Sequence, residues 1–219
     1  DFHAGFEEID LSKLLISLKR LELKNSSVNV QQGAVNETGV KAVTITSDSN
    51  VAPAKDWHFQ LKNLSIENNE FVYDNNAMKP ATSGMDYHHI HFTDFNIGAS
   101  QLSFSPGVFS GNINELTAKE NSGLLLKKFQ AGFYYSDTAA HISNMILQTD
   151  KTDLKNEINL KYASPSALSA KPGETFIQAN IAKSKIAAKD ILLFAPQLKS
   201  QLKGNENAVF LIDTKLKGF

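Results

Sequence analysis

The sequence predicts an all-β protein: an antiparallel meander of bulged hairpins that forms a curved, trough-like sheet or an open sandwich, with one or two short helices. Two observations predict it, an eight-residue apolar pattern that recurs along the chain and short polar clusters that follow its strongest copies. All-β chains of this length, 219 residues, often fold as one domain. We therefore expect residues 1–219 to form a single β-rich domain, part of a longer repetitive protein.

The recurring pattern is apolar, any residue, apolar, two polar residues, apolar, any residue, apolar. Its best copies are residues 16–23, 59–66 and 90–97. Every second side chain of a strand faces the same side, so an odd spacing such as Leu61 to Leu64 requires a β-bulge to keep both on one face. We expect Leu61 and Leu64 to share a face, and Phe92 and Phe95 likewise. The polar residues between them should face the other side or solvent: Lys62, Asn63, Thr93 and Asp94.

Two copies of the pattern extend into a longer match. Residues 18–30 align without a gap on residues 61–73, so that Leu21 corresponds to Leu64 and Val30 to Tyr73. A helix would place apolar residues three, four and seven positions apart, which this pattern fits poorly. The match therefore predicts a repeat of structure built from strands.

Polar pairs after the three best copies predict hairpin turns. These pairs are Asn25-Ser26, Asn68-Asn69 and Gly98-Ala99. Asn and Gly tolerate the positive φ that tight turns require. Three further stretches without periodicity, residues 46–56, 75–86 and 163–174, read as loops.

Helix signals are few. Asp10 and Ser12 precede an apolar run and predict a capped short helix over residues 11–18. A second helical segment is expected over residues 191–202, where Pro196 would interrupt it.

Charge and composition exclude several classes of function. The chain has 22 basic and 23 acidic residues, and Arg20 is its only arginine. Nucleic-acid binders show a basic excess or patch, and phosphate sites favour arginine, so we expect neither. The chain has no cysteine, and no apolar run approaches the ~18 residues of a membrane span. Because it begins at Asp1 rather than Met, we expect any membrane anchor to lie outside it.

The candidate chemical sites are weak. His89 and His91 share a strand face and could bind zinc together with Asp86 or another carboxylate, but their spacing is not a recognised metal pattern, and a polar face opposite Ile90 and Phe92 explains them without a metal. The sequence has neither the G-x-S-x-G motif of hydrolases nor a phosphate-binding loop. A carboxylate pair for glycoside hydrolysis is not indicated by any spacing. We therefore expect a protein that is not an enzyme and that needs no metal and no cofactor.

The apolar side chains of the strands are the best candidates for function. Aromatic residues are spread along them from Trp57 to Tyr135. In sequence, a strand face that packs on protein looks the same as one that contacts an acyl chain. If the face is a lipid groove, its lining is expected to include the residues of the two clearest copies: Phe59, Leu61, Leu64, Ile66, Phe92, Phe95 and Ile97.

Several stretches resemble the AsmA-like superfamily of bacterial envelope proteins, and within it TamB-like proteins of the Bacteroidetes type. Residues 9–15 followed by 21–28 are similar to the short-helix-then-strand unit of these proteins. The other matching stretches are residues 71–74 with 84–90, 116–124 and 189–196. Together they cover most of the chain between Ile9 and Leu198, and none of them is a catalytic signature.

The resemblance implies a periplasmic protein that an N-terminal helix anchors in the inner membrane. It implies a trough-like sheet whose apolar inside guides phospholipid acyl chains, and partners in outer-membrane assembly. This chain departs from the family pattern by lacking the anchor and the C-terminal domain of TamB-like members. The alternative is an extracytoplasmic β-sandwich module that binds carbohydrate or protein. A groove requires the apolar face to stay exposed to solvent, whereas a sandwich requires a second sheet to cover it.

Overall fold

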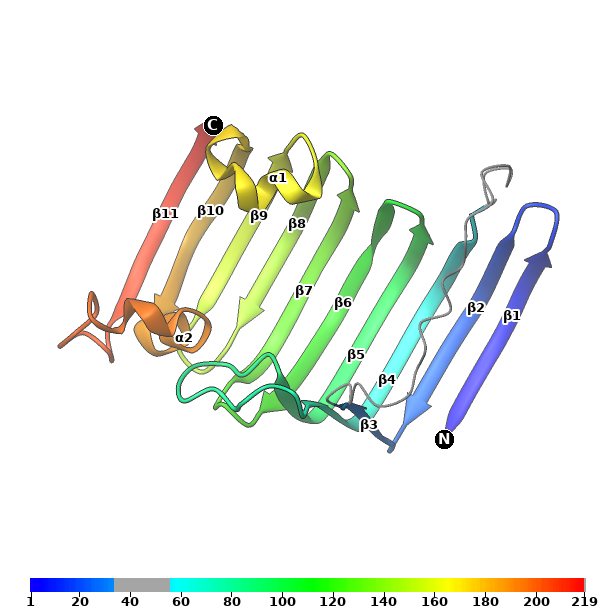
Figure 1. Cartoon of the computed structure of the whole chain (residues 1–219), viewed down its shortest axis with the longest axis horizontal. Coiled ribbons are helices and arrows are strands. Elements are labelled where there is room, and N and C mark those ends of the chain that lie inside the picture. The colour runs from blue at the N-terminus through cyan, green and yellow to red at the C-terminus, as the bar shows by residue number, and fades with distance from the viewer. Residues whose placement is uncertain (34–55, 219) are drawn as a thin grey trace.

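The structure, a computed structural model, describes residues 1–33 and 56–218. Strands make up 65% and helices 10% of it. The predicted loop at 46–56 lies outside the described residues except for Asp56. Figure 1 shows a single layer of strands with two short helices at opposite ends of the strands.

In the described part of the chain, eleven strands form one open sheet that is not closed into a barrel. They are β1 (Phe2–Asp10), β2 (Leu15–Lys24), β3 (Ser27–Gln32), β4 (His58–Asn75), β5 (His89–Ser105), β6 (Val108–Glu120), β7 (Leu125–Ser136), β8 (Ala139–Gln148), β9 (Asp153–Lys161), β10 (Phe176–Ala187) and β11 (Val209–Gly218). The order in the sheet is β1-β2-β4-β5-β6-β7-β8-β9-β10-β11, with β3 also beside β4. Only β2 and β3 run parallel to their neighbour β4. This arrangement confirms the predicted all-β, mostly antiparallel fold, with the described strands in one sheet rather than in two packed sheets.

The helices are α1 (Pro165–Ala170) and α2 (Ala188–Phe194), and short 3₁₀ turns follow them at Pro172–Glu174 and Pro196–Lys199. The prediction of a helical segment at 191–202 is confirmed in part, because α2 and the second 3₁₀ turn overlap it. α1 falls inside the predicted loop at 163–174.

The predicted helix over residues 11–18 is wrong. Residues 11–14 form a tight turn between β1 and β2, and Leu14 has a φ of 51°. Asp10 does accept the hydrogen bonds of a capping residue, since its Oδ1 receives the backbone N–H of Ser12 at 2.9 Å and of Lys13 at 3.0 Å. An Asx turn uses the same bonds as a helix cap, and here the alternating residues that follow continue as a strand.

Two of the predicted hairpin turns are also wrong. β4 continues through Asn68-Asn69, and β5 continues through Gly98-Ala99. The positive φ of Asn68, 51°, occurs inside the strand, at a shift in register with β5. A β-bulge needs the same backbone conformation as a tight turn, so Asn at such a position does not distinguish the two.

The third predicted turn, Asn25-Ser26, is a break between strands that does not reverse the chain. β2 and β3 both run parallel to β4, with Leu18 beside Leu61 and Val28 beside Phe71. Residues that correspond in the sequence repeat therefore lie side by side in the sheet, each 43 positions from its partner. The repeat predicted from sequence is confirmed as neighbouring parallel strands.

Corresponding asparagines bond to each other across this repeat. Asn68 Nδ2 donates to Asn25 Oδ1 at 2.7 Å, and both residues have positive φ, 51° and 50°. The next corresponding pair, Ser26 and Asn69, is also hydrogen-bonded, because Asn69 Oδ1 accepts from the backbone N–H of Ser26 at 2.8 Å. Asn69 is buried and also donates to the carbonyl of Leu23 at 3.0 Å. These bonds hold the two copies in register where the strand pattern breaks.

Replacement of Asn68 tests this junction. Asn68→Ala is expected to lower the free energy of unfolding by about 2 kcal/mol, because it removes a hydrogen bond and places a Cβ-bearing residue that lacks a side-chain oxygen in the left-handed region. Asn68→Gly loses the hydrogen bond but adopts the same φ without strain, so about 1 kcal/mol is expected. Urea unfolding measures both. Equal losses for the two variants would show that the backbone conformation at Asn68 contributes nothing.

Candidate functional site: an open apolar sheet face

The bulges keep the apolar side chains of β2 on one face. Ala4 and Phe6 of β1 are two residues apart, so they point to the same side. Their partners across the sheet are Leu21 and Leu18. Because paired residues of neighbouring strands share a face, Leu18 and Leu21 face the same side despite their odd spacing.

The parallel register carries the same arrangement into β4, where Leu61 lies beside Leu18 and Leu64 beside Leu21. Leu61 and Leu64 therefore share a face, as predicted. Lys62 faces the other side, where its Nζ pairs with Glu7 at 2.5 Å. Glu7 also accepts a hydrogen bond from Ser17, the neighbour of Leu18 on the opposite face.

The second predicted pair is confirmed by direct contact. The ring centroids of Phe92 and Phe95 are 5.9 Å apart. Between them, Asp94 has a φ of 50° and its carboxylate pairs with Lys119 at 2.6 Å. Thr93 lies opposite Lys119 in the register. The bulge at Asp94 thus keeps Phe92 and Phe95 on the apolar face and directs Thr93 and Asp94 to the polar face.

Cross-strand register joins the apolar residues into two rows that run across the strands. The row that we call the aromatic row crosses nine strands: Ile9, Ile16, Phe59, Phe104, Phe109, Tyr135, Ala140, Leu160 and Ile177. The row that we call the aliphatic row crosses eight: Phe2, Leu23, Ile66, Ile97, Leu116, Phe129, Leu147 and Leu154. Every position in both rows is apolar, so one face of the sheet is apolar from β1 to β9.

Within the described residues, α2 covers this face only at Leu147 and Leu154, and no second sheet packs on it. Phe59, Phe104 and Phe109 are 43%, 48% and 44% exposed. The fully buried apolar residues are mostly alanines, and no large side chain among those described is completely enclosed. The face therefore has the apolar residues of a protein core, but several of its large side chains are in contact with solvent.

The seven predicted lining residues all lie on this face. Phe59 is exposed, and the other six, Leu61, Leu64, Ile66, Phe92, Phe95 and Ile97, are half-buried. Sequence reasoning missed the part of the face on β1, where Phe2 and Phe6 are 64% and 63% exposed. The alternation of Phe2, Ala4 and Phe6 was the signal that could have revealed it.

Two apolar hollows lie on the face. One has a volume of about 200 Å³ and is lined by Ile16, Leu18, Phe59, Leu61, Leu102, Phe104 and Phe109 among others. Here Phe104 contacts Phe59 and Phe109, with centroid distances of 6.3 and 6.5 Å. The other hollow, about 260 Å³, lies where α2 meets β7, β8 and β9. Both hollows are lined mostly by apolar side chains.

The opposite face is polar and held by ion pairs. Lys24 Nζ pairs with Glu67 at 2.8 Å. The hydrogen bond from Lys62 lowers the pKa of Glu7, and the bond from Lys24 lowers the pKa of Glu67. This face stays ionised and hydrated at neutral pH, which sets it apart from the apolar one.

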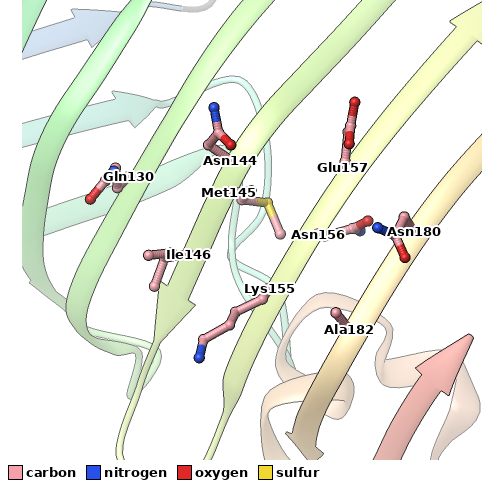
Figure 2. A pocket seen from close by; sticks show the side chains of 9 residues that line it. All are labelled: Gln130, Asn144, Met145, Ile146, Lys155, Asn156, Glu157, Asn180 and Ala182. Carbon is pink, nitrogen blue, oxygen red and sulfur yellow. The ribbon is translucent and has the colours of Figure 1, made fainter.

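A larger polar hollow of about 510 Å³ spans β7 to β10 near the bulge at Asn144. Figure 2 shows its side chains spread over four strands, with those of Asn156 and Asn180 pointing toward one another. Asn156 Oδ1 is buried and has no hydrogen-bond partner among the described residues. Lys155 and Glu157 bring opposite charges to the hollow, so charge of one sign is not concentrated there.

The histidines do not form a metal site. His89 Nδ1 lies 2.9 Å from Asp86, whereas His91 Nε2 lies 2.6 Å from Glu70. The bond to His91 lowers the pKa of Glu70. Across the described ranges, no three His, Asp or Glu side chains are placed to hold one ion. The two histidines lie on the polar side of β5, opposite Ile90 and Phe92.

None of the helices in the described part of the chain is long and apolar enough to cross a membrane. Comparisons with known proteins give no family to which the chain can be assigned: no family model matches it, and neither a curated protein nor a solved structure is significantly similar to it.

Proposed function

We propose that the chain is a non-enzymatic, lipid-guiding segment of a periplasm-spanning AsmA/TamB-like protein that takes part in phospholipid transport or outer-membrane biogenesis. One observation carries the proposal. Two uninterrupted rows of apolar side chains cross eight and nine strands; most large residues of the aromatic row are exposed to solvent, and those of the aliphatic row after Phe2 are half-buried. A soluble protein rarely exposes so extended an apolar surface unless that surface binds something.

The dimensions of the rows suit an acyl chain. Neighbouring strands are ~4.8 Å apart, so a row across eight strands is ~34 Å long. The hydrocarbon core of a bilayer holds two opposed acyl chains in ~30 Å, so one chain is about half as long as a row. Each methylene removed from water contributes about 0.8 kcal/mol. Partial burial along a row would offset much of the loss when a lipid leaves the bilayer.

The two unlike faces of the sheet also favour this function. The apolar face would contact acyl chains, while the polar face, with ion pairs such as Lys24–Glu67, remains in water. Guidance of a lipid needs no bond making, which agrees with the absence of a catalytic motif from the sequence. In this proposal, the membrane anchor and the surfaces that bind outer-membrane assembly partners lie in other segments of the protein.

Photo-crosslinking from positions on opposite faces of β4 tests this function. A photoreactive phenylalanine analogue is placed at Phe59 on the apolar face or at Lys62 on the polar face, and each protein is expressed in the envelope of a Gram-negative cell. Phe59 is expected to crosslink phospholipid at least tenfold more than Lys62, and mass spectrometry identifies the adduct. If the folded protein captured no lipid at Phe59, or captured carbohydrate or protein instead, the binding-module alternative would replace this function.

A further inference from the structure

α2 closes over the end of the aliphatic row. The hollow beneath it, the α2 cavity, has a volume of about 260 Å³. Leu147 and Leu154, the last two residues of the row, form part of its floor. Ile191 and Phe194 of α2 form its roof, and its walls include Leu124, Leu126 and Ile186. The aromatic row, by contrast, ends on β10 at Ile177, which does not line this cavity.

The polar groups that line the cavity bond to one another. Asp190 Oδ2, in the first turn of α2, accepts hydrogen bonds from the hydroxyls of Thr149 and Thr152, both at 2.6 Å. Thr152 Oγ1 in turn accepts from the backbone N–H of Ala187 at 3.0 Å. Both threonines are buried. The hairpin tip between β8 and β9 is thereby tied to the start of α2, and the remaining lining is apolar.

The other end of α2 is held by the loop between β4 and β5. This loop runs along the ends of the strands to reach α2 (Figure 1), where the backbone N–H of Met85 donates to the carbonyl of Leu193 at 2.7 Å. Gly84 has a φ of +74°, and a Cβ at this position would lie 2.9 Å from that carbonyl oxygen. The roof is thus fixed at both ends, although Phe194, the last residue of α2, is 48% exposed.

A cavity of this kind favours an apolar ligand over water. Sites that bind small ligands are concave and mostly apolar. The α2 cavity is partly open to solvent, and its lining is mostly apolar and offers water few partners. Taking ~30 Å³ for a group the size of a water molecule, it holds on the order of eight methylene-sized groups.

We propose that the α2 cavity binds the methyl end of a single unbranched acyl chain whose remaining length lies along the aliphatic row. The inference rests on the proposed function, because the row must first accept the chain. The cavity favours the methyl group for two reasons: the hydroxyls that line it are already bonded, and the Asp190 carboxylate repels an anionic headgroup. The cavity would therefore stop the chain at α2 and leave the headgroup over the open sheet.

Ile191→Trp tests the site, because it fills the cavity from the roof and leaves both rows unchanged. The probes are stearate spin-labelled near its methyl end or near its carboxyl end, followed by electron paramagnetic resonance. In the unaltered protein, the methyl-end label is expected to be immobilised and the carboxyl-end label to remain mobile. Ile191→Trp should release the methyl-end label and weaken stearate binding at least fivefold.

Leu192→Trp is the matched control, because it adds a tryptophan to α2 at a residue that does not line the cavity. This variant should bind stearate as the unaltered protein does. Circular dichroism melting checks each fold, and Ile191→Phe replaces Ile191→Trp if the latter does not fold. If stearate binds but Ile191→Trp leaves the methyl-end label immobilised, the α2 cavity is not the site and the proposed function stands. If the folded protein binds no stearate, both fail.

Discussion

Leu64→Asp and Phe95→Asp are each expected to reduce the capture of phospholipid at a Phe59 crosslinker by tenfold or more. Both side chains lie on the apolar face, and an acyl chain passing over them would have to remove water from the new carboxylate. Removing water from an unpaired charge costs at least several kcal/mol, whereas a tenfold loss requires only about 1.4 kcal/mol. Quantitative mass spectrometry of the lipid adduct measures the effect.

Lys62→Asp introduces the same side chain two residues away, on the polar face, and should leave lipid capture unchanged. It breaks the surface pair with Glu7, but such pairs contribute little to stability. Thermal unfolding separates loss of binding from loss of fold. On an open face the new aspartate stays hydrated in the free protein, so Leu64→Asp should cost only about 1–2 kcal/mol of stability. Complete unfolding of both apolar-face variants would instead mean that this face is a covered core.

Gly84→Ala is expected to destabilise the attachment of α2 by about 3 kcal/mol. The change combines a left-handed backbone, which costs a residue with a Cβ roughly 1–2 kcal/mol, with a collision. The added Cβ would lie 2.9 Å from the Leu193 carbonyl oxygen and 2.9 Å from Pro196 Cγ. Hydrogen exchange should show faster exchange of the Met85 amide and of the α2 amides than in the unaltered protein.

Gly204→Ala separates the two causes. Gly204 also has a positive φ, +84°, but a Cβ there would meet no atom within 4 Å. It should therefore show only the cost of the backbone conformation, and its effect should not reach the Met85 amide. Equal destabilisation by both substitutions would argue that the close approach of Gly84 to Leu193 contributes nothing.

The sequence predicted strands and faces better than it predicted their ends. Period-two alternation is fixed by strand geometry, so the odd spacing of Leu61 and Leu64 correctly indicated a bulge and a shared face. The ends depended on Asn and Gly, whose freedom to adopt positive φ serves bulges as well as turns. Asn68 therefore predicted a hairpin where β4 continues to Asn75. Asp10 predicted a helix for a similar reason, because an Asx turn and a helix cap use the same hydrogen bonds.

The candidate site was predictable only one strand at a time. The seven lining residues could be placed on one face because each copy of the pattern carries its own alternation. The two rows could not be predicted, since they depend on the register between strands, which a single sequence does not specify. The α2 cavity could not be predicted for a similar reason. The sequence predicts a helix that contains Ile191 and Phe194, but nothing in the local sequence places these residues over Leu147 and Leu154.

The order of the strands has a consequence for how the chain reaches this structure. From β4 to β11, each strand lies next to its predecessor in the sequence. Contacts between segments close in sequence form fastest, so each of these strands can pair with the strand before it as soon as both are present. The pairing of β2 with β4 spans 43 residues and is the slower step. Burst-phase protection of amides in β5 to β9, followed by later protection in β2 and β3, is the kinetic pattern that this topology dictates.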